Sequence, residues 1–460
     1  MILNIENLGA IKQAKIDLSK KLTIFCGGNS TGKTYAAYVL HALLSEELSY
    51  ISTKSIMPFY DLYQQIDKDG GSFTLEKKYV EKWVNLKCEH VRKNLGNIFG
   101  ISDDTCNSLF KDFSLTAEIS EQDFKRPISM THSFVWGRYT VKKKEGSDVI
   151  NIKKEVSSIE DTSIENSSAY RPGDNKWLFS IIFDSIIFSN TCRMLTVERN
   201  SIYTFKTELS LNRSELIDKI QNLTKSANAI ELLKASSRRY PEAIAESLYI
   251  ANDLVNVQKK KSPYSEIADR IENNLLMGEV STTPNGDVVF HASSMPETKQ
   301  LPFHMSSSIV KTMASLVIYL RHIAKVGDWL IIDEPEMNFH PDVQVLLAKV
   351  FSLLANKGLR LIVSTHSDYI VREFNNLIMA NSVVRKGSAV SLDDMGYSTD
   401  MLLDYNDINV VYFDRKNTEV TANSLPIDEM GFSIESIDET INQQNEVAEN
   451  LYAAFIDDEE

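Results

Sequence analysis

Residues 27–34 read Gly-Gly-Asn-Ser-Thr-Gly-Lys-Thr, which satisfies the phosphate-loop pattern G-x-x-x-x-G-K-[ST] in full. The glycines at 27 and 32 let the backbone curl so that successive N–H groups can point at phosphate oxygens. Lys33 is expected to reach the β- and γ-phosphates, and the Thr34 hydroxyl to ligate Mg2+. The predicted nucleotide-binding residues are Gly27, Gly28, Asn29, Ser30, Thr31, Gly32, Lys33, Thr34 and Tyr35.

The segments on either side of this loop have the order that the chemistry requires. Residues 21–26 form a short apolar run typical of a buried strand, and residues 35–48 follow with helical periodicity. The helix is expected to begin near Lys33 and to direct the positive end of its dipole at the loop. A glycine-rich turn matching by chance would not also carry the strand, the lysine and the hydroxyl, so a nucleotide site is favoured.

Two carboxylates follow about 300 residues after Lys33, at the end of the apolar run 329–332. Asp333 is expected to hold Mg2+ through its water shell, and Glu334, facing the other way, to polarise the attacking water. An edge strand that merely meets a loop is the alternative for this segment. The presence of a phosphate loop favours the catalytic interpretation, since that loop needs a carboxylate partner.

A histidine stands at the end of a further predicted strand, residues 359–364. This places His366 at the carboxyl edge of a strand, where ligands bind in open α/β sheets. A helix predicted over 341–355 separates this strand from the Asp-Glu strand. We expect His366 to contact the γ-phosphate, with a structural histidine as the alternative. The predicted catalytic residues are Glu334, His366 and Lys33, and the predicted metal ligands are Thr34 and Asp333.

The composition is that of an ordinary globular protein. The chain has 460 residues, 43% of them hydrophobic and 24% charged, which suffices for two or three domains. It lacks an apolar stretch of 18 residues and a signal peptide, so a cytoplasmic location without a membrane partner is predicted. Four scattered cysteines form neither a disulfide framework nor a C-x-x-C pair.

The net charge of -14 argues against a surface that grips nucleic acid everywhere. Basic clusters at 142–144, 153–154, 238–239 and 259–261 could still form a local stripe, or each could be a solvated face. Further predicted elements are strands over 2–7, 14–18 and 113–119, a loop over 157–174, helices over 79–94, 227–235, 241–257 and 434–455, and hairpins at 279–291 and 407–421.

The phosphate loop, the Asp-Glu-Pro strand and the strand ending in Thr-His-Ser, in this order, resemble ABC-type ATPases of the SMC and OLD kind. The resemblance implies an α/β fold: an ABC-type ATPase head with a mixed β-sheet lobe, a parallel-sheet RecA-like lobe and an inserted helical subdomain. The predicted organisation is an ATPase head from 1–50 and 280–420, a β-rich lobe from 51–200, a helical insertion from 201–279, and a C-terminal helical segment with an acidic end from 421–460.

Members of that family dimerise to hydrolyse ATP, so the resemblance implies a head-to-head dimer within a larger homo-oligomer. A serine-rich signature in the family caps the γ-phosphate of the opposite subunit. The matching residues here are Ser306, Ser307 and Ser308, at the start of a helix predicted to run to about Ala324. The match is degenerate because Ser308 replaces a glycine, and a simple helix N-cap is the alternative.

Two shorter stretches resemble the OLD group. Residues 336–341 are similar to its E-x-N-L-H-P motif, which serves as the dimer-facing D-loop, and residues 196–200 to its P-x-E-R-S strand end. Glu198 and Arg199 are therefore either neighbours of the site or an exposed ion pair. Gln64 and Gln65 are candidates for the family's glutamine loop.

Within the family, the chain looks most like the ATPase subunits of two-component anti-phage systems, with PARIS first and Septu second. Only 94 residues (460 minus 366) follow His366, too few for the TOPRIM nuclease domain of OLD proteins, so no intrinsic nuclease is expected. The resemblance implies an ATP-binding and hydrolysing switch and scaffold that controls a separate effector nuclease, a TOPRIM-type one in PARIS, with DNA or a phage protein as candidate trigger. The alternatives are an SMC-like DNA-binding ATPase in DNA repair or processing and, less favoured, a transporter subunit.

Overall fold

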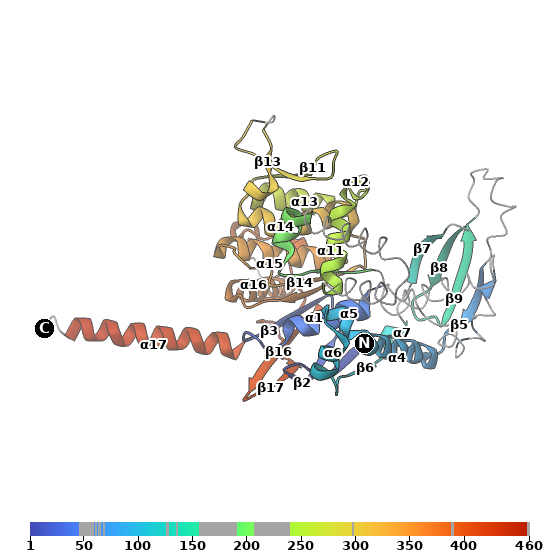
Figure 1. Cartoon of the computed structure of the whole chain (residues 1–460). Helices are drawn as coiled ribbons and strands as arrows, with labels where there is room; N and C mark the ends of the chain where they lie inside the picture. Colours follow the sequence, from blue (N-terminus) through green and yellow to red (C-terminus); the bar gives the residue numbers. More distant parts are fainter. Residues whose placement is uncertain are drawn as a thin grey trace.

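The computed structural model describes residues 1–45, 59, 62, 66–67, 70–125, 128–134, 137–155, 191–206, 240–296, 299–387 and 391–457. A nine-stranded mixed sheet forms its centre (Figure 1). In spatial order its strands are β10 (Cys192–Leu195), β14 (Trp329–Asp333), β15 (Arg360–Ser364), β3 (Leu22–Gly27), β16 (Ile408–Lys416), β17 (Glu419–Ser424), β2 (Ile11–Asp17), β1 (Ile2–Leu8) and β6 (Ser114–Glu118). The predicted α/β fold, part parallel and part mixed, is confirmed.

The first five strands of that order are parallel, and they are apolar because both faces of this half of the sheet are covered. Alternate side chains of β3 enter two different cores: Leu22 and Ile24 pack on one side, Phe25 on the other. The same alternation holds in β14, where Leu330 lies on the first side and Ile331 on the second. The period of two that distinguishes strand faces thus operates inside a continuously hydrophobic run.

Helices cover both faces of the sheet (Figure 1). On one face lie α1 (Lys33–Leu44), α4 (Lys77–Lys93) and α5 (Leu95–Phe99); on the other lie α13 (Ser265–Ile271), α14 (Ser308–Ile318), α15 (Pro341–Asn356) and α16 (Asp368–Arg385). The other α-helices of the described residues are α6 (Asp103–Leu109), α7 (Glu121–Lys125), α11 (Glu242–Asn252), α12 (Leu254–Val257) and α17 (Glu435–Asp457). Two segments are π-helical, η2 (Glu272–Leu276) and η4 (Tyr319–Ile323). Four short segments are 3-10 turns, η3 (Phe303–Met305), η5 (Asp393–Met395), η6 (Thr399–Met401) and η7 (Tyr405–Asp407). Among the described residues, no helix is both long enough and apolar enough to cross a membrane.

Two smaller antiparallel sheets lie away from the centre. One contains β4 (Ile66–Asp67), β5 (Gly70–Thr74), β9 (Val149–Glu155), β8 (Gly137–Lys143) and β7 (Ile128–Phe134). The other contains β11 (Gly278–Thr282), β12 (Val288–Ala292) and β13 (Leu301–Pro302). The hairpin predicted at 279–291 is confirmed as the β11–β12 pair, and the one predicted at 407–421 as the β16–β17 pair.

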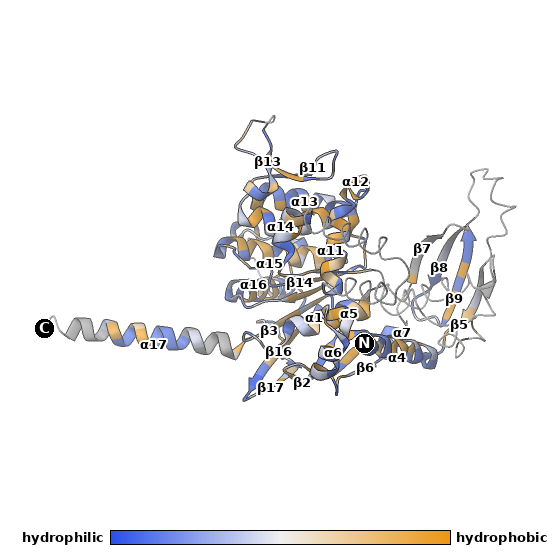
Figure 2. Cartoon of the chain, viewed as in Figure 1, coloured by the Kyte–Doolittle hydropathy of each residue, from blue (hydrophilic) through white to orange (hydrophobic). Residues whose placement is uncertain are grey.

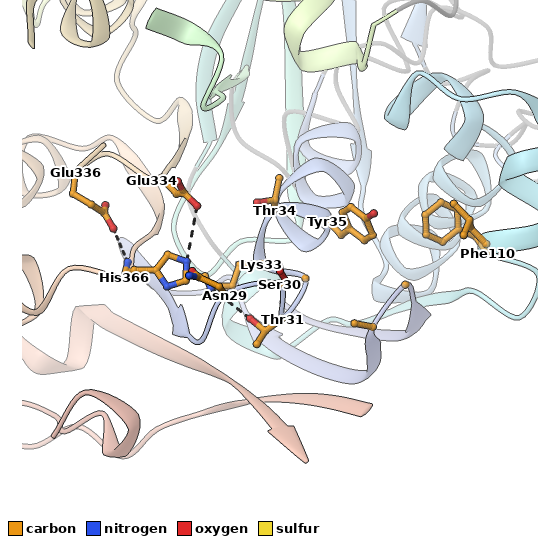
Figure 3. A pocket seen from close by; sticks show the side chains of 14 residues that line it. Asn29, Ser30, Thr31, Lys33, Thr34, Tyr35, Phe110, Glu334, Glu336 and His366 are labelled. Atoms are coloured by element: carbon orange, nitrogen blue, oxygen red, sulfur yellow. Dashed lines mark hydrogen bonds and ion pairs between the residues drawn. The ribbon is translucent and has the colours of Figure 1, made fainter. Parts of the chain in front are cut away.

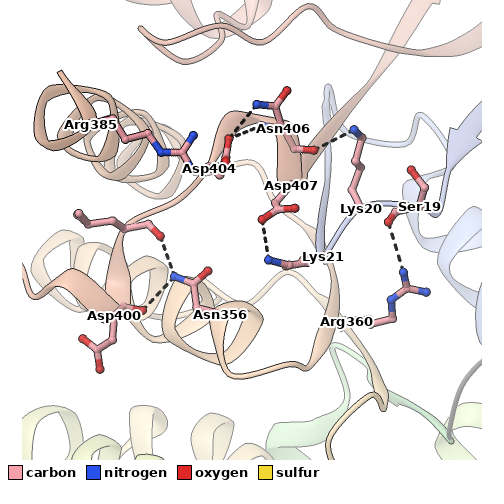
Figure 4. Close-up of polar contacts among 11 residues, drawn as sticks. Ser19, Lys20, Lys21, Asn356, Arg360, Arg385, Asp400, Asp404, Asn406 and Asp407 are labelled. Atoms are coloured by element: carbon pink, nitrogen blue, oxygen red, sulfur yellow. Dashed lines mark hydrogen bonds and ion pairs between the residues drawn. The ribbon is translucent and has the colours of Figure 1, made fainter. Parts of the chain in front are cut away.

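Polar contacts hold the segment before β16 against the start of β3 (Figure 4). Lys21 Nζ donates to Asp407 Oδ2 at 2.7 Å, and the Lys21 amide donates to the Asp407 carbonyl at 2.9 Å. Lys20 Nζ adds a bond of 2.9 Å to the carbonyl of Asn406. These contacts fix the register in which β16 runs beside the strand that carries the phosphate loop.

Several predicted boundaries need correction. The helix with periodicity over 35–48 begins at Lys33, as expected, but it ends at Leu44, because Ser45 is already extended (φ -73°, ψ 153°); residues 46–48 lie outside the described part of the chain. The helix predicted from the serine signature to about Ala324 is α-helical only to Ile318 and continues as the π-helix η4. The predictions for 157–174, 227–235, 238–239, Gln64 and Gln65 lie outside the described residues.

The proposed domain division does not follow the sheet strand by strand. β6 and β10 fall within 51–200, yet both belong to the nine-stranded sheet, and β17 crosses the boundary at 420. Strand pairing between segments far apart in sequence is what joins them. The predicted domain boundaries therefore remain a proposal about folding units, and the nine-stranded sheet is continuous across them.

Gly27, the last residue of β3, provides a test of this packing. A Cβ there would lie 2.5 Å from the Phe413 carbonyl oxygen of β16, and Gly27 has a φ of +128°. We expect Gly27→Ala to lower the free energy of unfolding by about 1–3 kcal/mol, measured by urea denaturation without nucleotide. Gly28→Ala is the control, since its Cβ would meet nothing closer than 3.9 Å. Equal losses in the two variants would contradict this explanation.

Candidate nucleotide-binding site

A cavity of about 930 Å3 opens at the carboxyl edge of the parallel strands (Figure 3). Five separate segments of the chain contribute to its wall. They are the turn between β1 and β2, the phosphate loop with the start of α1, the end of α6, and the segments that follow β14 and β15. The lining residues are Gly9, Ala10, Asn29, Ser30, Thr31, Gly32, Lys33, Thr34, Tyr35, Leu109, Phe110, Glu334, Glu336 and His366.

The phosphate loop has the conformation expected for binding an anion. Ser30 and Gly32 both have positive φ, 58° and 93°, which turns the loop back over itself. Gly32 is the N-cap of α1 and provides no side chain, so no side-chain cap satisfies the first N–H groups of the helix. These N–H groups and the helix dipole favour a negatively charged ligand at this end of the cavity.

Lys33 lies folded over the loop. Its Nζ donates to the carbonyls of Gly27 at 3.0 Å and Gly28 at 2.9 Å. Burial lowers the pKa of Lys33 to about 8, although the neighbouring Asp333 carboxylate opposes the shift. A phosphate group beside the ammonium would restore the lost charge stabilisation.

Asp333 and Thr34 meet beneath the loop. Thr34 Oγ1 donates to Asp333 Oδ2 at 2.8 Å, although the two residues stand 299 positions apart. Asp333 is fully buried, and its other oxygen, Oδ1, has no hydrogen-bond partner among the described residues. Burial therefore raises the pKa of Asp333. A hydroxyl beside a carboxylate with an unsatisfied oxygen is a donor set that suits Mg2+, so the residues present fit this ion.

These two ligands would complete a Mg2+ site only together with phosphate oxygens. In the part of the chain that is described, no group of three or more His, Cys, Asp or Glu residues could hold a metal by itself. Mg2+ normally keeps several waters and binds through one or two protein ligands plus the substrate's phosphates. That Thr34 and Asp333 bind Mg2+ together with phosphate oxygens remains a prediction.

The backbone at Glu334 is strained and is held by Arg199. Glu334 has a φ of 45°, which is unusual for a residue with a side chain. Arg199, almost fully buried, donates through Nη1 to the Asp333 carbonyl and through Nη2 to the Glu334 carbonyl, both at 2.7 Å. A third bond, from Nη1 to the Thr196 carbonyl at 2.9 Å, ties the guanidinium to its own turn. Arg199 thus fixes the peptide from which the Glu334 side chain projects.

His366 stands between two carboxylates (Figure 3). Its Nε2 lies 3.9 Å from Glu334 Oε1, and its backbone N–H donates to Glu336 Oε1 at 2.6 Å. Burial, followed by the charge of Lys33, lowers the pKa of His366, so the imidazole is neutral at neutral pH. The Glu334 amide also donates to the Ser364 carbonyl at 2.9 Å, which links the β14 and β15 ends directly.

The opposite end of the cavity is aromatic. The Tyr35 ring packs edge-on against Phe99 and Phe110, with centroids 5.3 and 6.2 Å apart. Its other side lies against Gly9, where a Cβ would come within 2.7 Å of the ring. With Lys33 and Glu334 at the phosphate end, this end is the one that can accommodate a nucleobase, because apolar and aromatic surfaces suit its π-face.

The cavity brings together most of the predicted site residues. Asn29 to Tyr35, Glu334 and His366 line it, while Gly27, Gly28 and Asp333 lie directly behind this wall. The serine signature does not line it: Ser306 is buried, its hydroxyl has no hydrogen-bond partner among the described residues, and Ser307 and Ser308 are exposed at the start of α14. The roles assigned to these residues remain predictions.

Five lining residues are not among the site residues predicted from the sequence: Gly9, Ala10, Leu109, Phe110 and Glu336. Glu336 was noted only as part of the D-loop motif, yet its carboxylate lines the cavity, and its Oε2 is buried without a partner among the described residues. Leu109 and Phe110 come from a helix end that carries no sequence signal for binding. Glu336 could have been found, because it follows the strand end that supplies Asp333 and Glu334.

The basic clusters do not form one exposed patch in the described part of the chain. Lys143 is buried and donates to the Phe124 carbonyl at 2.8 Å, while Lys142 and Lys153 are exposed on β8 and β9. The 259–261 cluster follows α12, away from that sheet (Figure 1). A continuous phosphate-tracking stripe is therefore not favoured by the described residues.

The pKa of Lys33 generates a prediction about pH. Free Lys33 loses its charge as pH rises through about 8, whereas a bound triphosphate favours the ammonium form. Nucleotide affinity should therefore fall as pH rises from about 8 to 9.5, by up to about tenfold per pH unit, in fluorescence titrations with a labelled nucleotide. Lys33→Arg, which stays charged over this range, should show a flat profile. A flat profile in the wild type would contradict the prediction.

The contacts of Arg199 lead to a prediction about catalysis. Lysine cannot reproduce the fork that reaches two adjacent carbonyls, so Arg199→Lys should loosen the Glu334 peptide. We expect kcat for ATP hydrolysis to fall by about tenfold or more with little change in KM, because a small misplacement of a catalytic group is costly. Arg193→Lys is the matched control, since Arg193 pairs with the Glu246 carboxylate instead. Parallel rises in KM in both variants would argue against a positioning role.

The chain matches one family model and is similar to solved structures. Residues 1–371 match a family model described as an AAA ATPase domain. Among solved structures, the chain is similar to an SmcHead bound to the C-winged helix domain of ScpA, with 12% identity, a TM-score of 0.35, and coverage of 93% of this chain and 98% of that chain. A second is an Smc head domain with an extended coiled coil bound to the C-terminal domain of ScpA, derived from Pyrococcus furiosus, with 12% identity, a TM-score of 0.33, and coverage of 97% and 98%.

Both TM-scores are low, so neither similarity defines the fold more closely. No curated protein sequence gives a match. The family model, by contrast, spans the phosphate loop, the Asp-Glu strand and His366 in one alignment. The chain therefore belongs to the family of AAA ATPase domains, which implies nucleotide binding.

Proposed function

We propose that this protein is an ATP-driven switch: it binds and hydrolyses ATP, assembles with further copies of itself, and thereby controls a separate effector in bacterial anti-phage defence. The observation that carries the ATPase part is the convergence of Lys33, Glu334 and His366 on one cavity, with Asp333 bonded to Thr34 behind it. The control of an effector is supported only by the resemblance of the motifs to ATPase subunits of two-component defence systems.

Different residues of the cavity would perform different parts of the transfer of the γ-phosphoryl group to water. The loop N–H groups and Lys33 would hold the β- and γ-phosphates, and Thr34 with Asp333 would hold Mg2+, which neutralises charge on the phosphate oxygens. Glu334 would accept the proton of the attacking water as the oxygen bonds to the γ-phosphorus and the bond to the leaving ADP breaks. Neutral His366 is placed to orient that water or to donate a hydrogen bond to the γ-phosphate.

The exposed serines at the start of α14 support the oligomeric part. Ser307 is the N-cap of α14 and makes no side-chain cap hydrogen bond, and Ser308 is the first residue of the helix, so the N–H groups of this first turn suit an anion. They do not line the cavity of their own chain, which leaves them free for the γ-phosphate held by a partner copy. This head-to-head arrangement would make assembly depend on bound ATP.

Glu334→Gln tests the central role. Removing the base while keeping the shape should reduce ATP turnover by about a hundredfold or more and trap nucleotide-bound oligomers, measured by phosphate release and by mass measurement with ATP. Lys33→Ala should abolish nucleotide binding and this ATP-dependent assembly. Glu279→Gln, on the hairpin strand β11, is a matched control and should leave both unchanged. Equal turnover in wild type and Glu334→Gln would refute the catalytic assignment.

The same preparations distinguish the alternative of an SMC-like DNA-binding ATPase. Stimulation of turnover by DNA, with an affinity that falls steeply as salt rises, would favour that alternative. Turnover that is insensitive to DNA, with copurification of a nuclease subunit, would favour the switch.

A further inference from the structure

The C-terminal helix α17 extends away from the body of the protein (Figure 1). It contains 23 residues, and every side chain described between Thr440 and Tyr452 is exposed. Large apolar residues are among them: Val447 is 53% exposed, Leu451 66% and Tyr452 71%. Figure 2 shows hydrophobic and hydrophilic residues alternating along the helix.

The base of the helix is fixed to the body. Phe432 and Ile434, just before α17, are buried in the core beside α16. Asn375 of α16 holds this point from both sides: its Nδ2 donates to the Phe432 carbonyl at 2.7 Å, and its Oδ1 accepts from the Phe432 amide at 3.0 Å. α17 therefore leaves from a defined point of attachment.

The apolar residues of α17 follow a heptad pattern. Six residues form one stripe along the helix, separated in sequence by four, three, four, three and four positions, and only the third of them is polar. The stripe positions are Ile437, Ile441, Gln444, Ala448, Leu451 and Phe455. The helix has six acidic residues and no Lys or Arg: Glu435, Asp438, Glu439, Glu446, Glu449 and Asp457. A coiled-coil seam of about three heptads is thus present in the sequence.

Such a helix is poorly suited to standing by itself. With no basic residue, it has no internal i,i+4 ion pair to offset repulsion between its carboxylates. Most helical stability in proteins comes from packing an apolar face, and the side chains of this face that the structure describes, Gln444, Ala448 and Leu451, are all exposed. A partner that covers the stripe would supply the missing stabilisation.

The placement of the charges indicates which partner fits. In heptad terms, the positions that flank the stripe carry little charge, because only one of the six acidic residues, Asp438, occupies one of them. The remaining flanking positions are Thr440, Asn445, Val447, Tyr452 and Ala454. Two identical helices could therefore meet along the stripe while nearly all their carboxylates point outward to water. A groove rimmed by basic side chains would require acidic residues at these flanks, and they are largely absent.

We propose that α17 pairs with the α17 of a second copy of this chain, in a coiled coil that needs no nucleotide. This contact is independent of the ATP-dependent head contact proposed above, because it uses a different part of the chain. The test is the mass of the full-length protein in nucleotide-free buffer, measured by sedimentation over a range of concentrations. We expect assemblies of at least two chains.

Two substitutions one residue apart make the test specific. Leu451→Asp places a carboxylate in the seam of both helices and should weaken self-association by about a hundredfold, leaving single chains at concentrations where the wild type is assembled. Asn450→Asp adds the same charge outside the stripe and should leave the mass unchanged. Because Leu451 is exposed in the single chain, neither change should lower the melting temperature of the body.

Three further outcomes are decisive. Lys33→Ala should keep the nucleotide-free assembly, which separates this proposal from the head contact. Oxidation of Ala448→Cys should crosslink two chains more readily than oxidation of Asn450→Cys if the helices pair in parallel, and a mixture of Gln444→Cys and Ala448→Cys chains should crosslink if they pair antiparallel. Single chains at every concentration without nucleotide, or equal effects of the two aspartate substitutions, would overturn the proposal.

Discussion

Parallel pairing of β14, β15 and β3 is the constraint on which the site depends. Their register places Asp333, Ser364 and Phe25 in one row across the sheet. Each strand then delivers its functional residue just past that row: Glu334 one position on, His366 two positions on, and the phosphate loop from residue 27. A shift of one residue in any of the three strands would turn the aligned side chains to the opposite face and separate the groups.

The carboxylates of Asp333, Glu334 and Glu336 gather at and just past the end of this row, close to the buried guanidinium of Arg199. The Arg199 guanidinium donates its hydrogen bonds to backbone carbonyls and not to carboxylates. Burial lowers the pKa of Arg199 to about 10, although several acidic neighbours, Asp333 most strongly, oppose this shift. Asp333 and Glu336 each keep one oxygen unpartnered among the described residues. Unsatisfied buried groups are costly, so a site of this kind is completed when a ligand with its own charges enters.

Local patterns were sufficient to predict the elements that carry the chemistry. The phosphate loop, the two carboxylates and His366 each follow a strand with a strong apolar signal, and the order of strand, loop and helix follows from sterics and dipoles. The wall at Phe110 could not be predicted, because it depends on β6 pairing with β1 across more than a hundred residues of intervening chain. The sequence left Arg199 as either a neighbour of the site or part of an exposed ion pair; that it reaches the Glu334 carbonyl depends on β10 lying beside β14. Long-range strand order is what periodicity leaves undetermined.

The proposed coiled coil of α17 and the proposed ATP-dependent contact between heads would influence each other only by holding the two chains close together. Once the helices join two chains, contact between their heads becomes intramolecular, and its effective concentration is set by the fixed base at Phe432 and the length of the helix. A weak contact through Ser307 and Ser308 could then form and break with each cycle of ATP without dispersing the assembly. The acidic face of α17 favours this arrangement, because charge on the outer surface keeps paired helices apart from other pairs. The enzyme would in this way combine a lasting contact with a switchable one.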